Sequence, residues 1–207
     1  MPDDVKHHQQ ARTRLARRAV VNSARVLFVE RGYTTTTIEA ISGHSDVPAP
    51  TVYRLFGSKL GILKALLDAS IAGDDQPVAV ADRLDVTPLF DQADPDRILA
   101  GFAGVATAIN ERSNDVYSVV VSAAASDPAA ADLLEDIQRQ RAEGQGRIVQ
   151  ALAKAGSLRA GISKRDAADL VHALASPELY RLLVVDRGWP PSRYREWLAL
   201  SLRQQLI

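Results

Sequence analysis

Hydroxyl, phenolic and cationic side chains are concentrated in one short stretch of the chain, at spacings that suit phosphate binding. Thr36 and Thr37 stand at the start of one predicted helix, Tyr53 lies within another, and Lys59 stands at the start of a third. Hydroxyl groups, cations and helix N-termini are the groups that bind phosphate oxygens. The basic arm that precedes this stretch could reach a nucleic-acid backbone or minor groove; it consists of Arg12, Arg14, Arg17 and Arg18.

Apolar residues at helical spacing predict the elements that position these groups. A first helix is expected over residues 9–31, and Gly32 follows it as a C-terminal stop. Thr36, followed three residues later by Glu39, forms a capping box that places a short second helix over residues 37–43. The apolar stripe expected on the first helix consists of Leu15, Val20, Ala24, Leu27 and Phe28.

A third and a fourth helix follow a tight turn. Because proline fits only at or before the first turn of a helix, the third helix begins within residues 48–50 and ends at Phe56. Ser58 caps the longer fourth helix. Two short helices joined by such a turn form a helix-turn-helix, whose second helix presents its N-terminal side chains to a major groove. The inward face is expected to carry Ile38, Ile41, Val47, Val52 and Phe56.

These motifs resemble a known family. The stretch from Phe28 to Ile41, then Val47 and the run from Thr51 to Lys59, are similar to the DNA-binding domain of tetracycline-repressor-like (TetR/AcrR) regulators. The resemblance covers about residues 12–68. It implies an all-helical homodimer that represses transcription and leaves DNA when a small molecule binds its C-terminal domain.

The resemblance also implies roles for individual residues. By position, Thr37, Tyr53 and Lys59 would bind phosphates. The residues at or near base edges would be Pro48, Ala49, Pro50, Thr51 and Arg54.

This sequence departs from the family pattern in two places. Asp46 stands where the turn usually carries glycine, but aspartate tolerates a left-handed backbone better than most residues. The third helix begins Pro48-Ala49-Pro50, without an early Lys, Asn or Gln that could form hydrogen bonds to bases. We therefore expect apolar contacts to thymine methyl groups, together with Thr51 and Arg54, to carry more of the base recognition.

Composition fits a chain with two differently charged parts. The 207 residues contain 25 basic and 25 acidic side chains and no cysteine, which excludes a disulfide scaffold and cysteine-based metal sites or nucleophiles. Nine basic and five acidic residues fall within residues 1–60, which leaves sixteen basic and twenty acidic ones in the remainder. The basic first part suggests an anionic partner. No signal peptide or membrane span is expected, and a cytoplasmic protein is the simplest interpretation.

The remainder of the chain is also helical in pattern. Residues 73–95 look irregular, with one helical turn near 79–85. Further helices are expected over residues 94–112, 114–125, 127–155 and 164–186, with Asn114 as an N-cap and a bend at Pro177, and a last helix follows the turn at residues 188–191 and runs to Gln205. The prediction is thus an all-α fold. It comprises a three-helix helix-turn-helix DNA-binding domain (residues 1–60) followed by a helical ligand-binding and dimerisation domain (residues 61–207).

Reading two half-sites through a helix-turn-helix requires a dimer, so part of the second domain should be self-complementary. The last two helices are the candidates, as half of a four-helix bundle. The alternative is that their apolar residues pack only within one chain. The candidate dimer contacts are Leu170, Leu174, Leu179, Leu182, Leu183, Tyr194, Trp197, Leu198 and Leu202.

A small-molecule effector site is expected among the middle helices. Such sites are mainly apolar with a few polar anchors. For each candidate a place in the ordinary core is the alternative interpretation, and nothing in the sequence identifies the effector. The candidates are Phe102, Val105, Ile109, Tyr117, Val121, Ile137, Gln140, Arg141 and His172.

Catalytic and metal-site patterns are not found. His44 and Asp46 lie two residues apart, but two ligands do not make a metal site. We expect neither an enzyme nor a cofactor. The expected partners are an operator in double-stranded DNA, a small-molecule effector and a second copy of the chain. The alternative function is a small-molecule-binding or carrier module with only non-specific DNA affinity. Whether the regulator represses or activates is left open by the sequence.

Overall fold

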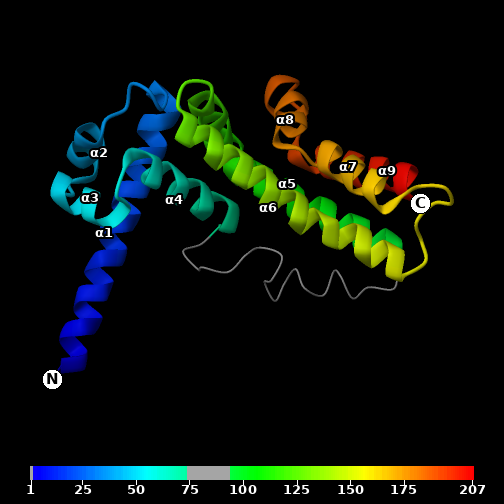
Figure 1. Ribbon diagram of the computed structural model, residues 1–207, viewed down its shortest axis with the longest axis horizontal. Coiled ribbons are helices and arrows are strands. Elements are labelled where there is room, and N and C mark those ends of the chain that lie inside the picture. The colour runs from blue at the N-terminus through cyan, green and yellow to red at the C-terminus, as the bar shows by residue number, and fades with distance from the viewer. Residues whose placement is uncertain (1, 74–93) are drawn as a thin grey trace. The chain divides into compact units, whose positions relative to one another are not determined.

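The computed structural model describes residues 2–73 and 94–207, with side chains from residue 9 onward, and the described residues form helices joined by short loops (Figure 1). No β-strand occurs among them, which confirms the all-α prediction. The turn expected near residues 79–85 lies outside the described residues. No described helix is long and apolar enough to span a membrane. The elements are α1 (Pro2–Arg31), α2 (Ile38–Ser45), α3 (Ala49–Phe56), α4 (Lys59–Ala72), α5 (Pro95–Ala124), α6 (Pro128–Lys154), α7 (Lys164–Leu174), α8 (Pro177–Tyr180), the π-helical segment η3 (Arg181–Asp186) and α9 (Pro191–Leu206).

The chain forms two compact units, and each is built from two separate stretches of sequence. Unit 1 comprises Met1–Ser70 and Asp115–Leu134, and unit 2 comprises Ile71–Asn114 and Glu135–Ile207. The predicted boundary at residue 60 does not coincide with this division, because residues 61–70 and 115–134 belong to unit 1. Helix α5 supplies residues to both units.

In unit 1, α2 and α3 pack beside α1 (Figure 1). Val20, Ala24 and Phe28 of α1 are fully buried, as the apolar stripe predicted. Leu15 is 67% exposed, so its place in that stripe was wrong. Helical periodicity shows which face of a helix is apolar, but it cannot show where the neighbouring helices stop covering that face.

The turn between α2 and α3 has the predicted left-handed residue. Asp46 follows α2 with φ 55° and ψ 21°. Ser42 supports the turn, since its hydroxyl donates a hydrogen bond to the carbonyl oxygen of Val47 at 2.7 Å. Val47 itself is buried. The departure from glycine at this position therefore leaves the helix-turn-helix geometry intact.

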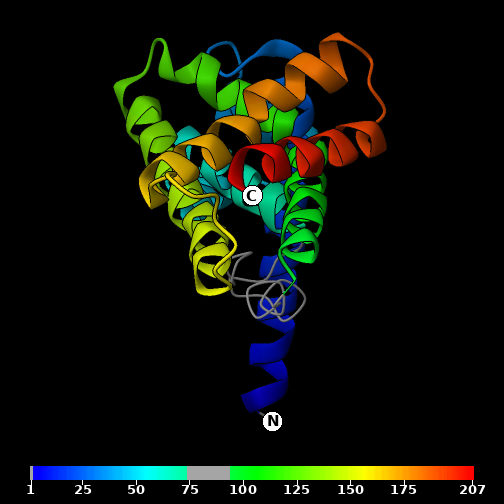
Figure 2. The same ribbon diagram turned by 90° about the vertical axis from the view of Figure 1, so that its right-hand side faces the viewer.

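Unit 2 has its core between α5, α6, α7 and α9, and α7 and α9 lie side by side (Figures 1 and 2). The break expected at Asn114 was wrong: α5 continues from Pro95 to Ala124. The amide of Asn114 instead donates to the carbonyl oxygen of Pro177 at 2.7 Å. The single helix expected over residues 164–186 is divided, because α7 ends at Leu174 and Ser176 caps a new start at Pro177.

Candidate nucleic-acid interface

Helix α3 presents one face to its own unit and the other to the outside. Its N-cap is Pro48, with φ −53° and ψ 138°, and its first turn contains Pro50. Val52 is fully buried and fixes the inward face. On the other face Tyr53 is 47% exposed, and Arg54 is also exposed. The remaining predicted base-edge residues are accessible: Pro48 and Pro50 are exposed, and Ala49 and Thr51 are half-buried.

The two threonines before α2 have roles that differ from the prediction: Thr37, not Thr36, caps the helix. Thr37 is the N-cap, and its hydroxyl oxygen accepts a hydrogen bond from the backbone N–H of Ala40 at 3.1 Å. Thr36 is buried, and its hydroxyl donates to the carbonyl oxygens of Gly32 at 2.8 Å and Leu27 at 3.2 Å. The prediction that Thr36 is exposed on a phosphate-binding surface was therefore wrong. The capping-box pattern points to Thr36, because Glu39 stands three residues after it, but the helix starts one residue later, with Ala40 as the third residue after Thr37.

Lys59 is accessible at the start of α4 but is already engaged within unit 1. Its Nζ donates to the carbonyl oxygen of Tyr33 at 2.8 Å and lies 4.2 Å from the centroid of the Tyr33 ring. The hydroxyl of Tyr33 in turn donates to Asp127 at 3.3 Å. Burial and the charge of Asp127 raise the pKa of Tyr33 to about 12. A phosphate at Lys59 would therefore join an ammonium whose position is fixed beforehand.

The basic arm lies along the exposed part of α1. Arg12, Arg14 and Arg18 are exposed. Arg17 also holds α1 to α3, because its Nη1 donates to the carbonyl oxygen of Leu55 at 2.9 Å. Its guanidinium carbon lies 4.7 Å from the centroid of the Phe56 ring. The arm thus combines three accessible charges with one that also supports the recognition helix.

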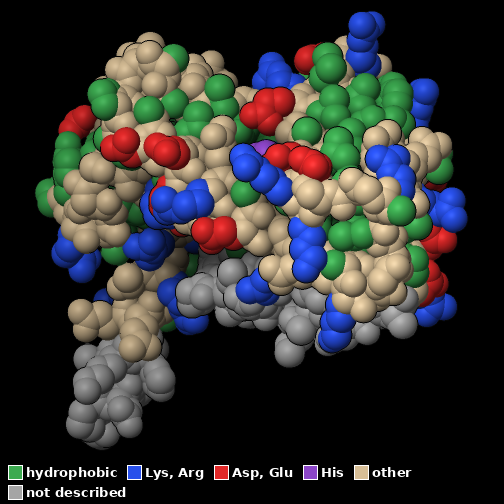
Figure 3. All heavy atoms as spheres, turned by 45° about the vertical axis from the view of Figure 1, so that its right-hand side comes forward, with side chains coloured by type: hydrophobic (Ala, Val, Ile, Leu, Met, Phe, Trp, Pro, Cys, Tyr) green, Lys and Arg blue, Asp and Glu red, His purple; other side chains and the backbone are tan. Residues whose placement is uncertain are grey.

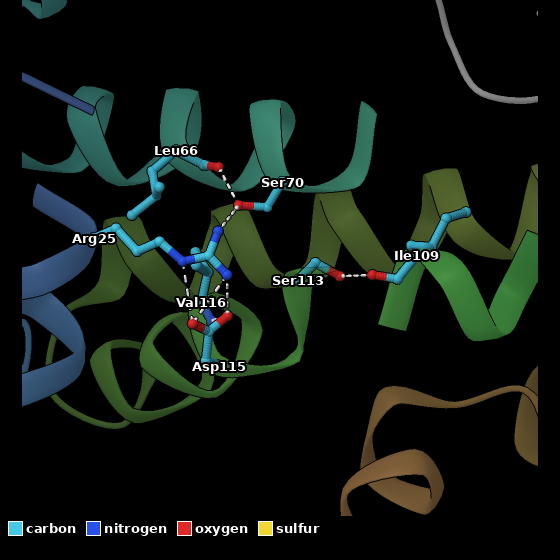
Figure 4. Close-up of polar contacts among 7 residues, drawn as sticks. All are labelled: Arg25, Leu66, Ser70, Ile109, Ser113, Asp115 and Val116. Atoms are coloured by element: carbon cyan, nitrogen blue, oxygen red, sulfur yellow. Dashed lines mark hydrogen bonds and ion pairs between the residues drawn. The ribbon is translucent and has the colours of Figure 1, made fainter. Parts of the chain in front are cut away.

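A polar cluster of Arg25, Ser70 and Asp115 supports α1 and was not predicted from the sequence (Figure 4). Arg25 forms a two-pronged ion pair with Asp115 of α5, with Nη2 lying 2.9 Å and 3.0 Å from the two carboxylate oxygens. Nη1 of Arg25 also donates to the hydroxyl of Ser70 on α4 at 3.4 Å. The three residues join α1, α4 and α5 within unit 1. Arg25 and Asp115 are 90 positions apart in the sequence, so local spacing gives no signal of their contact.

The candidate dimer contacts separate into a core set and a surface set. Tyr194, Leu198 and Leu202 are fully buried within the single chain, so their assignment to a partner surface was wrong and the intrachain alternative holds for them. Leu182 is 49% exposed, and the other predicted contacts are half-buried: Leu170, Leu174, Leu179, Leu183 and Trp197. Val185 and Leu200, which the prediction did not include, are also exposed apolar residues.

The candidate effector residues are not all interior. Val121 is 41% exposed and Gln140 is exposed, whereas Phe102 and Tyr117 are buried. Val105, Ile109 and Ile137 are half-buried. Tyr117 and Val121 belong to unit 1 and the others to unit 2. Arg141 and His172 are brought together within unit 2, with Nη2 and Nε2 2.6 Å apart.

Comparison with known proteins agrees with this geometry. Residues 20–66 match the family model described as bacterial regulatory proteins, tetR family. The transposon Tn10 TetC protein of Escherichia coli is 42% identical over 60 residues, which is 29% of this chain and 30% of TetC. The chain thus spans less than a third of the curated relative that it matches.

Two solved structures share the fold over nearly the whole chain. NalD of Pseudomonas aeruginosa, the secondary repressor of the MexAB-OprM multidrug efflux pump, is 20% identical with a TM-score of 0.68 and covers 93% of this chain and 96% of its own. The transcriptional regulator FadR of Bacillus subtilis, in complex with stearoyl-CoA, is 14% identical with a TM-score of 0.71 and covers 91% of this chain and 98% of its own. At these identities the likeness concerns the fold.

Proposed function

We propose that this chain, whose residues 20–66 match the tetR family model of bacterial regulatory proteins, binds DNA as a repressor and that a small molecule releases it from a palindromic operator. The observation that carries the proposal is the outward face of α3. Tyr53 and Arg54 are exposed there while Val52 anchors the helix in unit 1. Phosphate contacts would come from Thr37, Tyr53 and Lys59, and base contacts from the first turn of α3.

Base recognition would depend mainly on shape and apolar contact. Pro48, Ala49 and Pro50 offer no side-chain hydrogen bond to a base edge, whereas Thr51 and Arg54 do. Apolar side chains distinguish thymine by its methyl group. We therefore expect an operator whose half-sites contain thymine at the positions that face Pro48 to Pro50.

Selection from a pool of random duplexes with the full chain tests this proposal. Enrichment of a palindrome with half-sites about one helical turn apart, roughly 34–36 Å, is the expected result. Binding that depends on salt but not on sequence would contradict it and would favour a small-molecule-binding module with only non-specific DNA affinity. Repeating the selection with Arg54→Ala should change or relax the enriched half-site, because Arg54 is an exposed cation of α3.

Two half-sites require two copies of the chain. The exposed apolar residues Leu182, Val185 and Leu200 support a partner contact through η3 and α9. In the space-filling view hydrophobic side chains gather at the upper right, where α8 and η3 lie (Figure 3). Isolated apolar residues are ordinary on a surface, but a contiguous group favours an interface.

Sedimentation velocity measures the oligomeric state directly. We expect a dimer for the wild-type chain and a monomer for the variant Leu182→Glu/Val185→Glu, because two charges would be buried without partners in the interface. Leu15→Glu is the control, since Leu15 is also an exposed leucine, at 67% against 49% for Leu182, but belongs to unit 1, and its substitution should leave the dimer intact. A monomeric wild-type chain at micromolar concentration would contradict the proposal.

For an effector to release the chain from DNA, its binding must change the position of α1. FadR shows that the same fold can hold a ligand, stearoyl-CoA in that case. Helix α5 supplies core residues such as Ile98 and Leu99 to unit 2, and its Asp115 holds Arg25 of α1 in unit 1. A ligand that displaces α5 in unit 2 would therefore act on the helix that supports α1.

A further inference from the structure

A group of polar side chains lies on the inward face of α6 in unit 2. Arg141 and Gln145 are one helical turn apart, and Ile148 and Leu152 continue the same face at the next two turns. Gln145 is buried with an exposed fraction of 9%, and Ile148 and Leu152 are buried in the core. A charged side chain on a stripe that is otherwise turned toward the core is costly unless its surroundings supply hydrogen bonds. Its presence there therefore calls for a functional explanation as well as a structural one.

His172 of α7 completes this group through both ring nitrogens. Nε2 lies 2.6 Å from Nη2 of Arg141, and Nδ1 lies 2.9 Å from Oε1 of Gln145. A guanidinium can only donate, so Nε2 must accept, and the ring proton is on Nδ1 and is donated to Gln145. The imidazole is therefore neutral in this arrangement.

The electrostatic surroundings keep the imidazole neutral. Burial and the positive charge of Arg141 lower the pKa of His172, and together they outweigh the opposing carboxylates of Glu178 and Asp169. Nη2 of Arg141 also lies 3.4 Å from the carbonyl oxygen of His172. The ring and the carbonyl group of His172, which Arg141 contacts on α7, are thus both neutral acceptors.

Two tyrosines provide an apolar neighbourhood for this charge. Tyr194 is close enough to Arg141 for its charge to act on the pKa of the phenol, and Tyr180 meets Tyr194 edge to face at 5.0 Å between ring centroids. The hydroxyl of Tyr194 donates to the carbonyl oxygen of Leu174 at 3.3 Å, so its ring faces the core. Both rings are buried, so they make the surroundings of the guanidinium apolar, and effector sites combine an apolar lining with a few polar anchors.

We propose that Arg141, Gln145 and His172 form the anion-recognising end of the effector site, and that the effector is a small molecule with an apolar body and a carboxylate or phosphate group. The planar guanidinium matches the two oxygens of either group, and charge-assisted hydrogen bonds of this kind are the strong ones. Neutral His172 adds orientation without adding charge. The inference rests on the proposed effector-responsive function, which it deepens by naming the class of effector.

Three probes with the same eight-carbon tail test the proposal on the full chain without DNA: octanoate, octyl phosphate and octanol. Isothermal titration calorimetry should give at least tenfold tighter binding for one of the two anions than for octanol. The anion that binds more tightly identifies the source of the charge as carboxylate or phosphate. Equal binding of all three probes, or no binding of any, would overturn the proposal.

Variants at Arg141 assign the preference to this site. Arg141→Met should reduce the preference for the anion to less than twofold, whereas retention of the tenfold preference would overturn the assignment. Should Arg141→Met fail to fold, Arg141→Lys keeps the charge but removes the planar fork, and we expect it to lose at least fivefold in affinity for the anion. Arg147→Met is the matched control, because Arg147 is an exposed arginine of the same helix.

Operator binding measured in parallel separates this proposal from the function on which it rests. Failure of anion binding with sequence-selective DNA binding intact would overturn only the class of effector. Loss of sequence-selective DNA binding with anion binding intact would overturn only the proposed function.

Discussion

The ammonium of Lys59 donates a hydrogen bond to the carbonyl oxygen of Tyr33 at 2.8 Å and lies 4.2 Å from the centroid of its ring. This contact joins the start of α4 to the segment that follows α1. Tyr33 is itself held by Asp127 of the second stretch of unit 1. The side chain expected to bind a phosphate is therefore also part of the scaffold that positions α3.

Substitution at Lys59 should reveal both contributions. Lys59→Ala should reduce the slope of log affinity against log salt by about 0.9, the value for one phosphate contact, and weaken binding to all duplexes alike. It should also lower the free energy of unfolding, since the contact with Tyr33 is lost. Lys64→Ala is the control, because Lys64 is exposed on the same helix, where it forms a salt bridge with Asp68. The measurement is DNA affinity over a salt series together with urea denaturation.

Tyr53→Phe removes the hydroxyl while keeping the ring. We expect weaker binding to every duplex without a change in the free energy of unfolding, because the Tyr53 side chain is 47% exposed. Fluorescence anisotropy with selected and random duplexes measures the effect. Unchanged affinity in both Tyr53→Phe and Lys59→Ala would show that these groups do not bind phosphate.

The turn at Asp46 offers a test of backbone strain. Asp46 has φ 55°, a conformation that glycine adopts without steric cost. Asp46→Gly should therefore leave the free energy of unfolding unchanged or raise it by up to about 1 kcal/mol, and Asp46→Val should lower it. Urea denaturation distinguishes these results. A loss of stability in Asp46→Gly would mean that the carboxylate contributes more to the turn than its backbone conformation costs.

Gly61 is required by close approach. A Cβ atom at this position would lie 2.0 Å from the carbonyl oxygen of Phe56, at the end of α3. Gly61→Ala should destabilise the chain by roughly 1–3 kcal/mol, since the contacting atom belongs to the backbone and cannot move independently. Gly43→Ala is the matched control: Gly43 lies within α2 with nothing within 4 Å of its Cβ position, so alanine should stabilise by about 1 kcal/mol.

His172 should make stability depend on pH in the acidic range. Its pKa in the folded chain is lowered from the usual 6.5, so the unfolded chain binds the proton more readily. The contribution of neutral His172 to the free energy of unfolding is therefore fully present above pH 6.5. It is lost as the pH falls through the lowered pKa of His172 in the folded chain. Thermal denaturation between pH 7.5 and 5 measures this loss, and His172→Asn should reduce it. Proton NMR titration of the imidazole would contradict the argument if His172 titrated at or above 6.5.

The sequence predicted best those features that depend on contacts between neighbouring residues. The turn at Asp46, the buried Val52 and the start of α3 at its prolines follow from backbone and side-chain properties of a few neighbouring residues. The prediction for Thr36 was wrong because α2 starts one residue later than the Thr36–Glu39 pattern indicates, and the hydroxyl of Thr37 supplies the cap. The prediction that Asn114 caps a new helix was wrong because the same side chain can instead donate a hydrogen bond to a distant helix. Here the acceptor is the carbonyl oxygen of Pro177.

Long-range contacts could not be read from the sequence. The pairs Arg25–Asp115 and Tyr33–Asp127 each join residues more than 85 positions apart, and no local spacing links the two partners of either pair. The apolar face of α9 was predicted correctly. The sequence pattern of such a face is the same whether residues of its own chain or of a partner chain cover it. Burial of Tyr194, Leu198 and Leu202 decides this for those residues only.

The continuity of α5 limits how this chain can be recombined with others. Its 30 residues, about 45 Å of helix, begin in unit 2 and end in unit 1. A chimera that joins residues 1–70 to a foreign sensor would lose Asp115 and Asp127, and with them the partners of Arg25 and Tyr33. A transferable DNA-binding module would have to carry residues 115–134 as well, so engineered exchange of sensors requires crossovers at three points along the chain.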